Sequence, residues 1–294
     1  MNILVTGASG QLGRSLQDIS GGYDFDFVFT DVEAGRGVVA LDATDAAAVD
    51  KIMREKKIDV VINCAGYTDV NKAEDEEDKA YRINAELPAV LAAAAKKTDA
   101  LLMHISTDYI FDGKSSVPYR EDDEPGPLGA YARTKLEGEK AVKQSGCRYM
   151  IFRTAWMYSS YGKNFMRTME SLTADCPSVN VVIDQTGTPT YAGDLAQAIM
   201  QIIENDMLDR VGTYNYTNEG VCTWYDFAKA VNRICGYTCD VRPCRSEEFP
   251  SKVTRPSYSV LDKSLFKKTF ETEILHWEDV LEMAIKEYFE KLNK

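Results

Sequence analysis

Tyr131 and Lys135 stand four residues apart in a stretch with a helical pattern, so one face of the helix carries both, one turn apart. A tyrosine near its ordinary pKa of about 10 is protonated at neutral pH and can donate a proton. A neighbouring ammonium stabilises the phenolate and lowers the pKa of that tyrosine. The pair has the chemistry of a general acid. This spacing is also common on solvent-exposed helices, so the surrounding elements decide whether the pair is functional.

A glycine-rich turn near the start of the chain indicates a dinucleotide site. The short apolar run 2–6 leads into a G-x-x-G-x-x-G turn, and a helical pattern follows to Ile19. The first glycine permits a tight turn, the second lets the backbone approach a pyrophosphate, and the third lets the helix pack on the strand. A βα turn that merely needs glycine is the alternative. The expected cofactor contacts here are Gly7, Gly10, Gln11, Leu12 and Gly13, at the positive end of the helix.

Acidic residues after the next strand bear on the choice of cofactor. Asp31 ends the second apolar run, about 20 residues beyond the glycine turn, where a carboxylate accepts hydrogen bonds from the adenosine ribose hydroxyls. That arrangement favours NADH, whereas the nearby Arg36 could pair with the 2′-phosphate of NADPH. The sequence leaves both cofactors open. Asp42, followed by Ala43, could accept from the adenine amino group, although an ordinary loop acid fits equally well.

Two later strand ends add small and hydroxyl side chains. The run 58–62 opens onto residues 64–66, whose small size lets the backbone lie against a cofactor. The run 101–105 ends at Ser106 and Thr107. A hydroxyl pair at the carboxyl end of a strand is where a site is expected in an open α/β sheet. The expected cofactor contacts in the first of these segments are Cys64, Ala65 and Gly66.

The order of the elements predicts the fold. Up to about residue 152, strands and helices alternate, which implies an α/β fold with a Rossmann-like, doubly wound parallel sheet. Beyond that point strands and helices no longer alternate regularly. We expect a dinucleotide-binding domain at 1–152 and a smaller, interleaved C-terminal substrate-binding lobe at 153–294. A segment at about 184–205 is expected to return to the first domain.

Composition limits the classes of function. The 294 residues carry a net charge of −12, which disfavours binding to nucleic acid or to an anionic membrane, so an anionic ligand needs local basic residues. No apolar run is long enough to span a bilayer, and the first residues read as a strand, so we expect a cytoplasmic protein. Seven scattered cysteines, two histidines and no C-x-x-C favour reduced thiols over a structural metal site.

Longer strings within this frame resemble a known family. The glycine turn, Ser106-Thr107 and the Tyr131…Lys135 pair resemble the extended short-chain dehydrogenase/reductases that act on nucleotide sugars. A closer similarity, to the dTDP-4-dehydrorhamnose reductase family, extends from Met1 to about Asp262. It is carried by STDYIFDG at 106–113, RTAW at 153–156, DQTGTPT at 184–190 and RPSYSVLD at 255–262.

The resemblance implies reduction of the C4 ketone of dTDP-4-dehydro-L-rhamnose to dTDP-L-rhamnose by NADPH or NADH. Thr107 would hold the substrate carbonyl, Tyr131 would donate the proton, and Lys135 would lower its pKa and bind the nicotinamide ribose. Arg255 would contact the nucleotide diphosphate or help shape its site. Alternatively, the aromatic residues in these strings are ordinary core residues or part of a strand. Asn84 lies near the position of a helix asparagine of the family, but this match is weaker. The implied substrate contacts are Thr107, Asp108, Tyr109, Phe111, Trp156 and Arg255.

The sequence departs from the family at one metal site. Some members hold Mg²⁺ at a dimer interface through two glutamates, whereas Ser15 and Gly193 stand at the corresponding positions here and cannot act as carboxylate ligands. We therefore expect no metal, and a homodimer is left open.

Other functions on the same fold remain alternatives. One is a different nucleotide-sugar enzyme, either an epimerase, a 4,6-dehydratase or a reductase of another keto sugar. Thr107-Asp108 meets half of what a dehydratase needs. The other is a non-catalytic regulatory subunit, against which the intact Thr107, Tyr131 and Lys135 argue.

Overall fold

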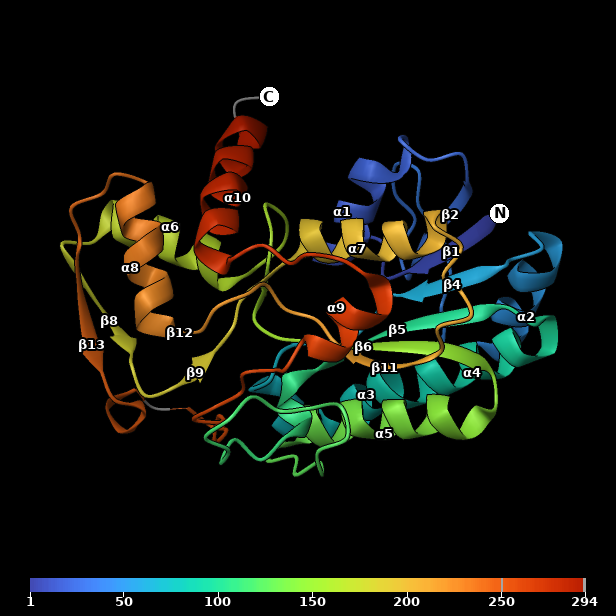
Figure 1. The fold of residues 1–294 in the computed structure, drawn as a ribbon, viewed down its shortest axis with the longest axis horizontal. Helices are drawn as coiled ribbons and strands as arrows, with labels where there is room; N and C mark the ends of the chain where they lie inside the picture. The colour runs from blue at the N-terminus through green and yellow to red at the C-terminus, as the bar shows by residue number, and fades with distance from the viewer. Residues whose placement is uncertain (250, 293–294) are drawn as a thin grey trace.

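A seven-stranded, wholly parallel sheet forms the centre of the molecule in the computed structural model, which describes residues 1–249 and 251–292 (Figure 1). The strand order reverses between β1 and β4, which is the switch point at which open α/β sheets bind ligands. The prediction of a Rossmann-like sheet is confirmed. Across the sheet the strands are β3 (Val39–Ala40), β2 (Asp26–Asp31), β1 (Asn2–Thr6), β4 (Val60–Asn63), β5 (Leu101–Thr107), β6 (Arg148–Thr154) and β11 (Gly212–Asn215).

Helices cover both faces of the sheet because its strands are apolar on both sides (Figure 1). Successive residues of β1 point to opposite faces. Ile3 and Val5 pack with α1 and α7, whereas Leu4 packs with α2 and α4. One face carries α1 (Gln11–Ser20), α7 (Ala192–Glu204) and α9 (Ser264–Phe270), and the other carries α2 (Ala46–Glu55), α4 (Leu87–Thr98) and α5 (Ala130–Ser145).

A second lobe with its own core lies beside the carboxyl edge of the sheet, on the left in Figure 1. Its core contains Phe227, Val231 and Leu281, and a capping box formed by Thr223 and Asp226 starts α8. None of the described helices is both long and apolar enough to cross a bilayer. The lobe consists of α6 (Phe165–Asp175), α8 (Trp224–Ile234), α10 (Trp277–Leu292) and the strand pairs β8 (Ser178–Val182) with β13 (Asp240–Cys244), β7 (Met157–Tyr158) with β10 (Thr190–Tyr191), and β9 (Thr186–Gly187) with β12 (Cys222–Thr223).

The chain crosses between the two parts more than once. Helix α7 packs on α1, and β11 joins the sheet beside β6 before α8 returns to the lobe. The domain division at residue 152 stays a prediction.

Between β4 and α4 the chain forms a 3-10 turn, η1 (Lys72–Glu74), and a short helix, α3 (Glu77–Tyr81). A π-helical turn, η2 (Arg82–Glu86), then joins α3 to α4. Pro88 explains this turn because it has no N–H to donate to the carbonyl four residues earlier, at Asn84.

Candidate active site

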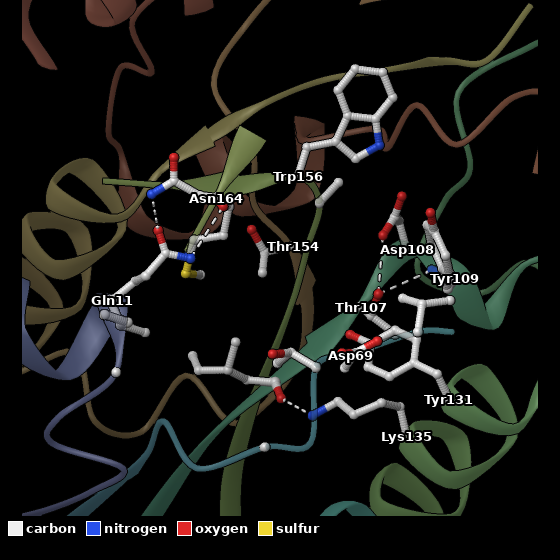
Figure 2. Close-up of a pocket in the computed structure, with 18 of the residues that line it drawn as sticks. Gln11, Asp69, Thr107, Asp108, Tyr109, Tyr131, Lys135, Thr154, Trp156 and Asn164 are labelled. Carbon is white, nitrogen blue, oxygen red and sulfur yellow. Dashed lines mark hydrogen bonds between the residues drawn. The ribbon is translucent and has the colours of Figure 1, made fainter. Parts of the chain in front are cut away.

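A cavity of about 690 Å³ opens at the carboxyl edge of the central sheet. Its wall brings together the glycine turn, the ends of β4 and β5, the start of α5 and a segment of the second lobe, 162–165. Figure 2 shows Thr107, Tyr131 and Lys135 on one side of it, with Gln11 and Asn164 on the other. The predicted site residues that line it are Gly10, Gln11, Leu12, Cys64, Ala65, Gly66, Thr107, Asp108, Tyr109, Tyr131, Lys135, Trp156 and Arg255.

Other predicted site residues lie outside this wall within the described part of the chain. They are Gly7, Gly13, Asp31, Asp42, Ala43 and Phe111. Phe111 is fully buried and stacks on Tyr119, with ring centroids 4.4 Å apart. The structure therefore places Phe111 in a core cluster behind the site.

The glycine turn is shaped to receive a phosphate. Gly7 has a φ of +67°, and a Cβ atom there would lie 2.5 Å from the backbone nitrogen of Ala65. A Cβ atom at Gly13 would lie 2.5 Å from the Cα of Ala8. Gly10 caps α1 without a side-chain hydrogen bond, and the first turn carries no acid. The first amides of α1 are therefore available to an anion, which fits the pyrophosphate of a dinucleotide.

Asp31 is bound to the same turn. Its Oδ2 accepts from the backbone N–H of Ser9 at 2.9 Å, and its Oδ1 accepts from that of Val32 at 2.8 Å. This contact fixes the carboxylate at the end of β2, beside the glycine turn. The carboxylate is half-exposed, so it can also meet the ribose of a bound cofactor.

Asp42 belongs to a separate polar group. Its Oδ1 accepts from the Thr44 hydroxyl at 2.6 Å, and these hydrogen bonds lower the pKa of Asp42 below its ordinary value. The Arg82 guanidinium donates to the Thr44 hydroxyl at 2.8 Å. Asp42 is therefore an ionised acceptor near the predicted adenine end of the site.

The proposed acid–base residues meet at the end of β5. The Thr107 hydroxyl donates to Oδ1 of Asp108 at 3.0 Å and accepts from the N–H of Tyr109 at 3.2 Å (Figure 2). Tyr131, in the first turn of α5, lies edge-on to Tyr109, with ring centroids 5.8 Å apart. The two hydroxyls of Thr107 and Tyr131 thus border the same corner of the cavity.

Burial sets the proton affinities of Tyr131 and Lys135. It raises the pKa of Tyr131 above the usual range, and a hydrogen bond with Thr107 offsets part of that effect. It lowers the pKa of Lys135 to about 8, while the carboxylate of Glu139 acts in the opposite direction. The Lys135 ammonium donates to the carbonyl of Ile105 at 2.6 Å. We expected Lys135 to lower the pKa of Tyr131, whereas in this structure burial, followed by the charges of Asp108 and Tyr109, raises it, so Tyr131 is a neutral proton donor at pH 7.

Asp108 and Tyr109 also have shifted proton affinities. Burial raises the pKa of Asp108 to about 7, against the opposing effect of the Ser259 and Thr107 hydroxyls. Burial likewise raises the pKa of Tyr109 to about 12, although the Arg255 guanidinium lowers it. A carboxyl that changes charge near pH 7 therefore stands directly beside the Thr107 hydroxyl.

Trp156 forms an aromatic wall with a residue that the sequence did not single out. Its backbone has a φ of +46°, which is rare for a bulky residue and marks local strain. Its indole stacks on Trp224 with ring centroids 3.6 Å apart, and Phe165 meets Trp224 edge-on at 4.6 Å. Trp224 lines the cavity. In the sequence it reads only as the start of a helix, because nothing local shows that it faces Trp156.

Further lining residues come from loops. Lys163, in the turn that begins at Gly162, adds a cation to the cavity wall beside the glycine turn. Its position between a strand and a helix was the available signal, since binding residues concentrate on such loops. Ser106, of the hydroxyl pair at the end of β5, also lines the cavity. The other lining residues not predicted are Thr68, Asp69, Val70, Asn71, Ile105, Thr154, Ala155, Met157, Gly162, Asn164 and Phe165.

The family positions for Mg²⁺ do not fit a metal here. The Ser15 hydroxyl donates to the carbonyl of Gln11 at 3.0 Å, and a side chain at Gly193 would collide with the ring of Tyr191. No cluster of three or more His, Cys, Asp or Glu residues that could hold a metal ion occurs among residues 1–249 and 251–292.

Asn84 has a structural role in this arrangement. Its side-chain oxygen accepts from the N–H of Tyr67 at 2.8 Å, and its amide donates to the carbonyl of Tyr67 and to the hydroxyl of Thr134 at 3.1 Å each. Asn84 therefore joins the loop after β4 to helix α5, which carries Tyr131.

Comparisons with known proteins agree with this geometry. The family described as RmlD substrate binding domain matches residues 1–290. A dTDP-4-dehydrorhamnose reductase of Mycolicibacterium smegmatis is 40% identical over 96% of this chain and 84% of its own length. The solved structure of a dTDP-4-dehydrorhamnose reductase of Clostridium acetobutylicum is 44% identical, with a TM-score of 0.91 over 100% of both chains. That of Bacillus anthracis, in complex with NADP, is 35% identical, with a TM-score of 0.88 over 97% of this chain and 99% of that one. The chain belongs to the RmlD substrate binding domain family, which its relatives identify as that of the dTDP-4-dehydrorhamnose reductases.

Proposed function

We propose that this protein reduces the C4 ketone of dTDP-4-dehydro-L-rhamnose to dTDP-L-rhamnose with NADPH or NADH. The observation that carries the proposal is the meeting of Thr107, Tyr131 and Lys135 in one cavity with the glycine turn. The relatives named as dTDP-4-dehydrorhamnose reductases support the choice of substrate. The relative in complex with NADP supports the class of cofactor.

The reduction needs hydride at carbon and a proton at oxygen, and the bound nicotinamide supplies the hydride. Thr107 donates a hydrogen bond to the substrate carbonyl, and Tyr131 transfers its proton as negative charge develops on that oxygen. The Lys135 ammonium, one turn along α5, stabilises the phenolate that Tyr131 becomes. Because the site is partly withdrawn from water, these charge interactions are stronger than they would be in bulk solvent.

Cationic and aromatic side chains of the cavity would bind the parts of the substrate that do not react. Lys163 and Arg255 supply positive charge to phosphate groups in a protein whose net charge is −12. Trp156 and Trp224 both line the cavity and offer an apolar surface to the sugar or base. We place the work of this enzyme in the cytoplasm. Sedimentation would test whether the protein forms a homodimer.

The test follows loss of nicotinamide absorbance with dTDP-4-dehydro-L-rhamnose and each cofactor. The Tyr131→Phe variant should lose at least about 10²-fold in kcat, because it keeps the ring and removes the proton. Tyr237→Phe is a matched control, since that hydroxyl bonds to Glu170 in the second lobe. Nearly unchanged turnover by folded Tyr131→Phe would remove Tyr131 from the role of acid. No oxidation of either cofactor by the wild type would contradict the proposed reaction.

A reductase of a different keto sugar is the second candidate. A Streptomyces antibioticus relative, 37% identical over 97% of this chain and 94% of its own, is named a probable dTDP-4,6-dihydroxy-2-methyloxan-3-one 4-ketoreductase. Comparing kcat/KM for the two keto sugars distinguishes these candidates. An epimerase would retain NAD through purification, and a regulatory subunit would turn over neither sugar.

A further inference from the structure

Glu139 is a fully buried carboxylate on the helix that carries the proposed acid. It lies one turn beyond Lys135 and two turns beyond Tyr131, on the same side of α5. Its Oε1 accepts from the Ser106 hydroxyl at 2.6 Å and from Nε of Arg153 at 3.0 Å. Its Oε2 accepts from Nη2 of Arg153 at 2.9 Å and from Nζ of Lys143 at 3.0 Å. Both oxygens are therefore fully bonded.

These bonds join α5 to the strand that ends in Thr107. Ser106 immediately precedes Thr107 in β5, and Arg153 is its partner across the sheet in β6. Arg153 is itself 2% exposed, and its Nη1 donates to the carbonyl of Glu121 at 2.9 Å. One carboxylate thus fixes the separation between the helix of Tyr131 and the strand end of Thr107.

A buried charge is costly unless it is paired and hydrogen-bonded. Burial alone would raise the pKa of Glu139, but Arg153, Lys143 and Ser106 together lower it to about 2. Glu139 is therefore a carboxylate at every pH at which the enzyme works. A buried apolar residue would pack here without that cost, so stability alone does not explain the ion pair of Glu139 with Arg153.

Lys135 supplies that reason. The titratable groups that interact with its charge are Glu139 on α5 and His104 on β5. Burial, followed by the charge of Lys135, lowers the pKa of His104 well below its ordinary value, so His104 is neutral. Glu139 is the one carboxylate among the described residues that favours the ammonium form of Lys135.

The surroundings of Glu139 itself are cationic or neutral. Arg153 and Tyr149 face it from β6, and Lys143 faces it from the next turn of α5. Among these, Lys143 and Tyr149 are only partly buried, and 35% of the Lys143 side chain is exposed. The carboxylate therefore stands between Lys135 on one side and the Arg153–Lys143 pair on the other.

We infer that Glu139, held by Arg153 and Ser106, is a positioning residue of the active site that fixes α5 against β5 and keeps Lys135 in its ammonium form. The inference concerns Lys135 whatever the substrate, although its effect on turnover rests on the proposed function. Glu139 does not line the cavity. It acts through Lys135 and through the register of the helix.

The direct test titrates Lys135 by NMR in protein with ¹³C-labelled lysine, assigned with Lys135→Met. In Glu139→Gln, the midpoint should fall by about one pH unit, because the nearest negative charge is removed. Glu139→Asp keeps the charge and should return the midpoint toward the wild-type value. Lys143→Met is the matched control, since it removes a partner of Glu139 without removing the carboxylate, and its midpoint should not fall.

Turnover provides the second readout. The pH at which Lys135 loses its proton, and kcat/KM therefore falls, should be lower in Glu139→Gln by the same amount as the NMR midpoint. Glu139→Gln should therefore lose several-fold more activity at pH 8 than at pH 6. A merely structural role would lower the rate equally at all pH values. If Glu139→Gln does not fold, the double variant Glu139→Gln/Arg153→Met removes both charges and leaves neither unpaired. An unchanged Lys135 midpoint in either folded variant overturns the inference. A wild type that reduces no keto sugar would overturn the proposed function, while the NMR titration would still decide the role of Glu139.

Discussion

The side-chain oxygen of Gln11 accepts a hydrogen bond from the Asn164 amide at 2.9 Å and so joins the glycine turn to a residue 153 positions later (Figure 2). The same oxygen accepts from the Ser159 hydroxyl at 3.0 Å, and the Gln11 amide donates to the carbonyl of Met157 at 3.3 Å. One residue of the predicted cofactor turn therefore holds the loop of the second lobe that carries Lys163. The cofactor and substrate sides of the cavity share this contact.

Gln11→Ala should weaken both ligands. Removing the amide releases the 157–164 loop from α1, so we expect the dissociation constants of the cofactor and of the nucleotide sugar to rise together by several-fold, as ordering that loop becomes part of binding. Isothermal titration with each ligand measures this. Ser20→Ala is the control, because Ser20 lies at the other end of the same helix and bonds to the carbonyl of Gln17. Weaker cofactor binding with unchanged sugar binding would show that Gln11 serves the cofactor alone.

The sheet was predictable from the sequence because its signals are local. Each apolar run is followed by a turn and a helix, and the fixed handedness of such crossovers leaves few strand orders. The glycine turn and the hydroxyl at Thr107 could be placed for the same reason, since each stands at a strand end. The partners of Gln11 and the stack of Trp156 on Trp224 could not, because they join residues far apart in sequence.

Phe111 lies in the core and not in the cavity, and the local backbone conformation explains why. Tyr109 and Phe111 would share a face in an extended strand. The structure instead has a 3-10 turn, η3 (Asp108–Ile110), which directs Tyr109 to the cavity and Phe111 to the core. The Thr107 hydroxyl caps this turn through the N–H of Tyr109. A hydroxyl followed by an acid fits both a strand end and a capped turn, so the sequence did not separate them.

Asp108 should give the rate a pH dependence near neutrality. When Asp108 is protonated it can donate to Thr107, which leaves the Thr107 proton free for the substrate carbonyl. Above its pKa of about 7 the carboxylate accepts that proton instead and also raises the pKa of Tyr131. We expect kcat/KM to fall first as the pH rises through about 7, before the fall near pH 8 that Lys135 causes, and Asp108→Asn to lack only the first fall. The same limb in both proteins would assign it to another group.

Asp108→Asn should also change stability in a pH-dependent manner. The pKa of Asp108 is higher in the folded chain than in the unfolded one, so its favourable contribution is complete at low pH and is lost as the pH rises through about 7. The amide has no charge to bury. The Tm of the variant, relative to the wild type, should therefore increase by a few degrees between pH 5 and pH 8 in scanning calorimetry. A constant difference would contradict the raised pKa.

Asp31 should set the preference between the two cofactors. Its carboxylate is fixed beside the glycine turn by Ser9 and Val32, where it would repel the 2′-phosphate of NADPH and accept from the 2′-hydroxyl of NADH. In Asp31→Ala, the ratio of kcat/KM for NADPH to that for NADH should rise about tenfold or more, a difference of roughly 1.4 kcal/mol. Asp42→Ala is the comparison, since Asp42 lies near the predicted adenine end and should affect both cofactors alike.

Gly187 should control the position of the Trp156 indole. A Cβ atom there would lie 2.7 Å from the Cε2 and Cζ2 atoms of Trp156 and 3.0 Å from the Ser259 hydroxyl. The indole has no room on its other face, where Trp224 stacks at 3.6 Å. The added methyl of Gly187→Ala must therefore displace the ring toward the cavity or break the stack.

We expect Gly187→Ala to raise KM for the nucleotide sugar by about tenfold while cofactor binding is kept, because the glycine turn lies elsewhere on the cavity wall. Tryptophan fluorescence should change in the same variant, as the Trp156–Trp224 stack is disturbed. Gly21→Ala is the control, since a Cβ atom at Gly21 meets no other atom within 4 Å among the described residues. If Gly187→Ala keeps KM but changes the fluorescence, the position of the indole does not matter to the sugar. Trp156 would then be a part of the lobe's core rather than of the substrate pocket.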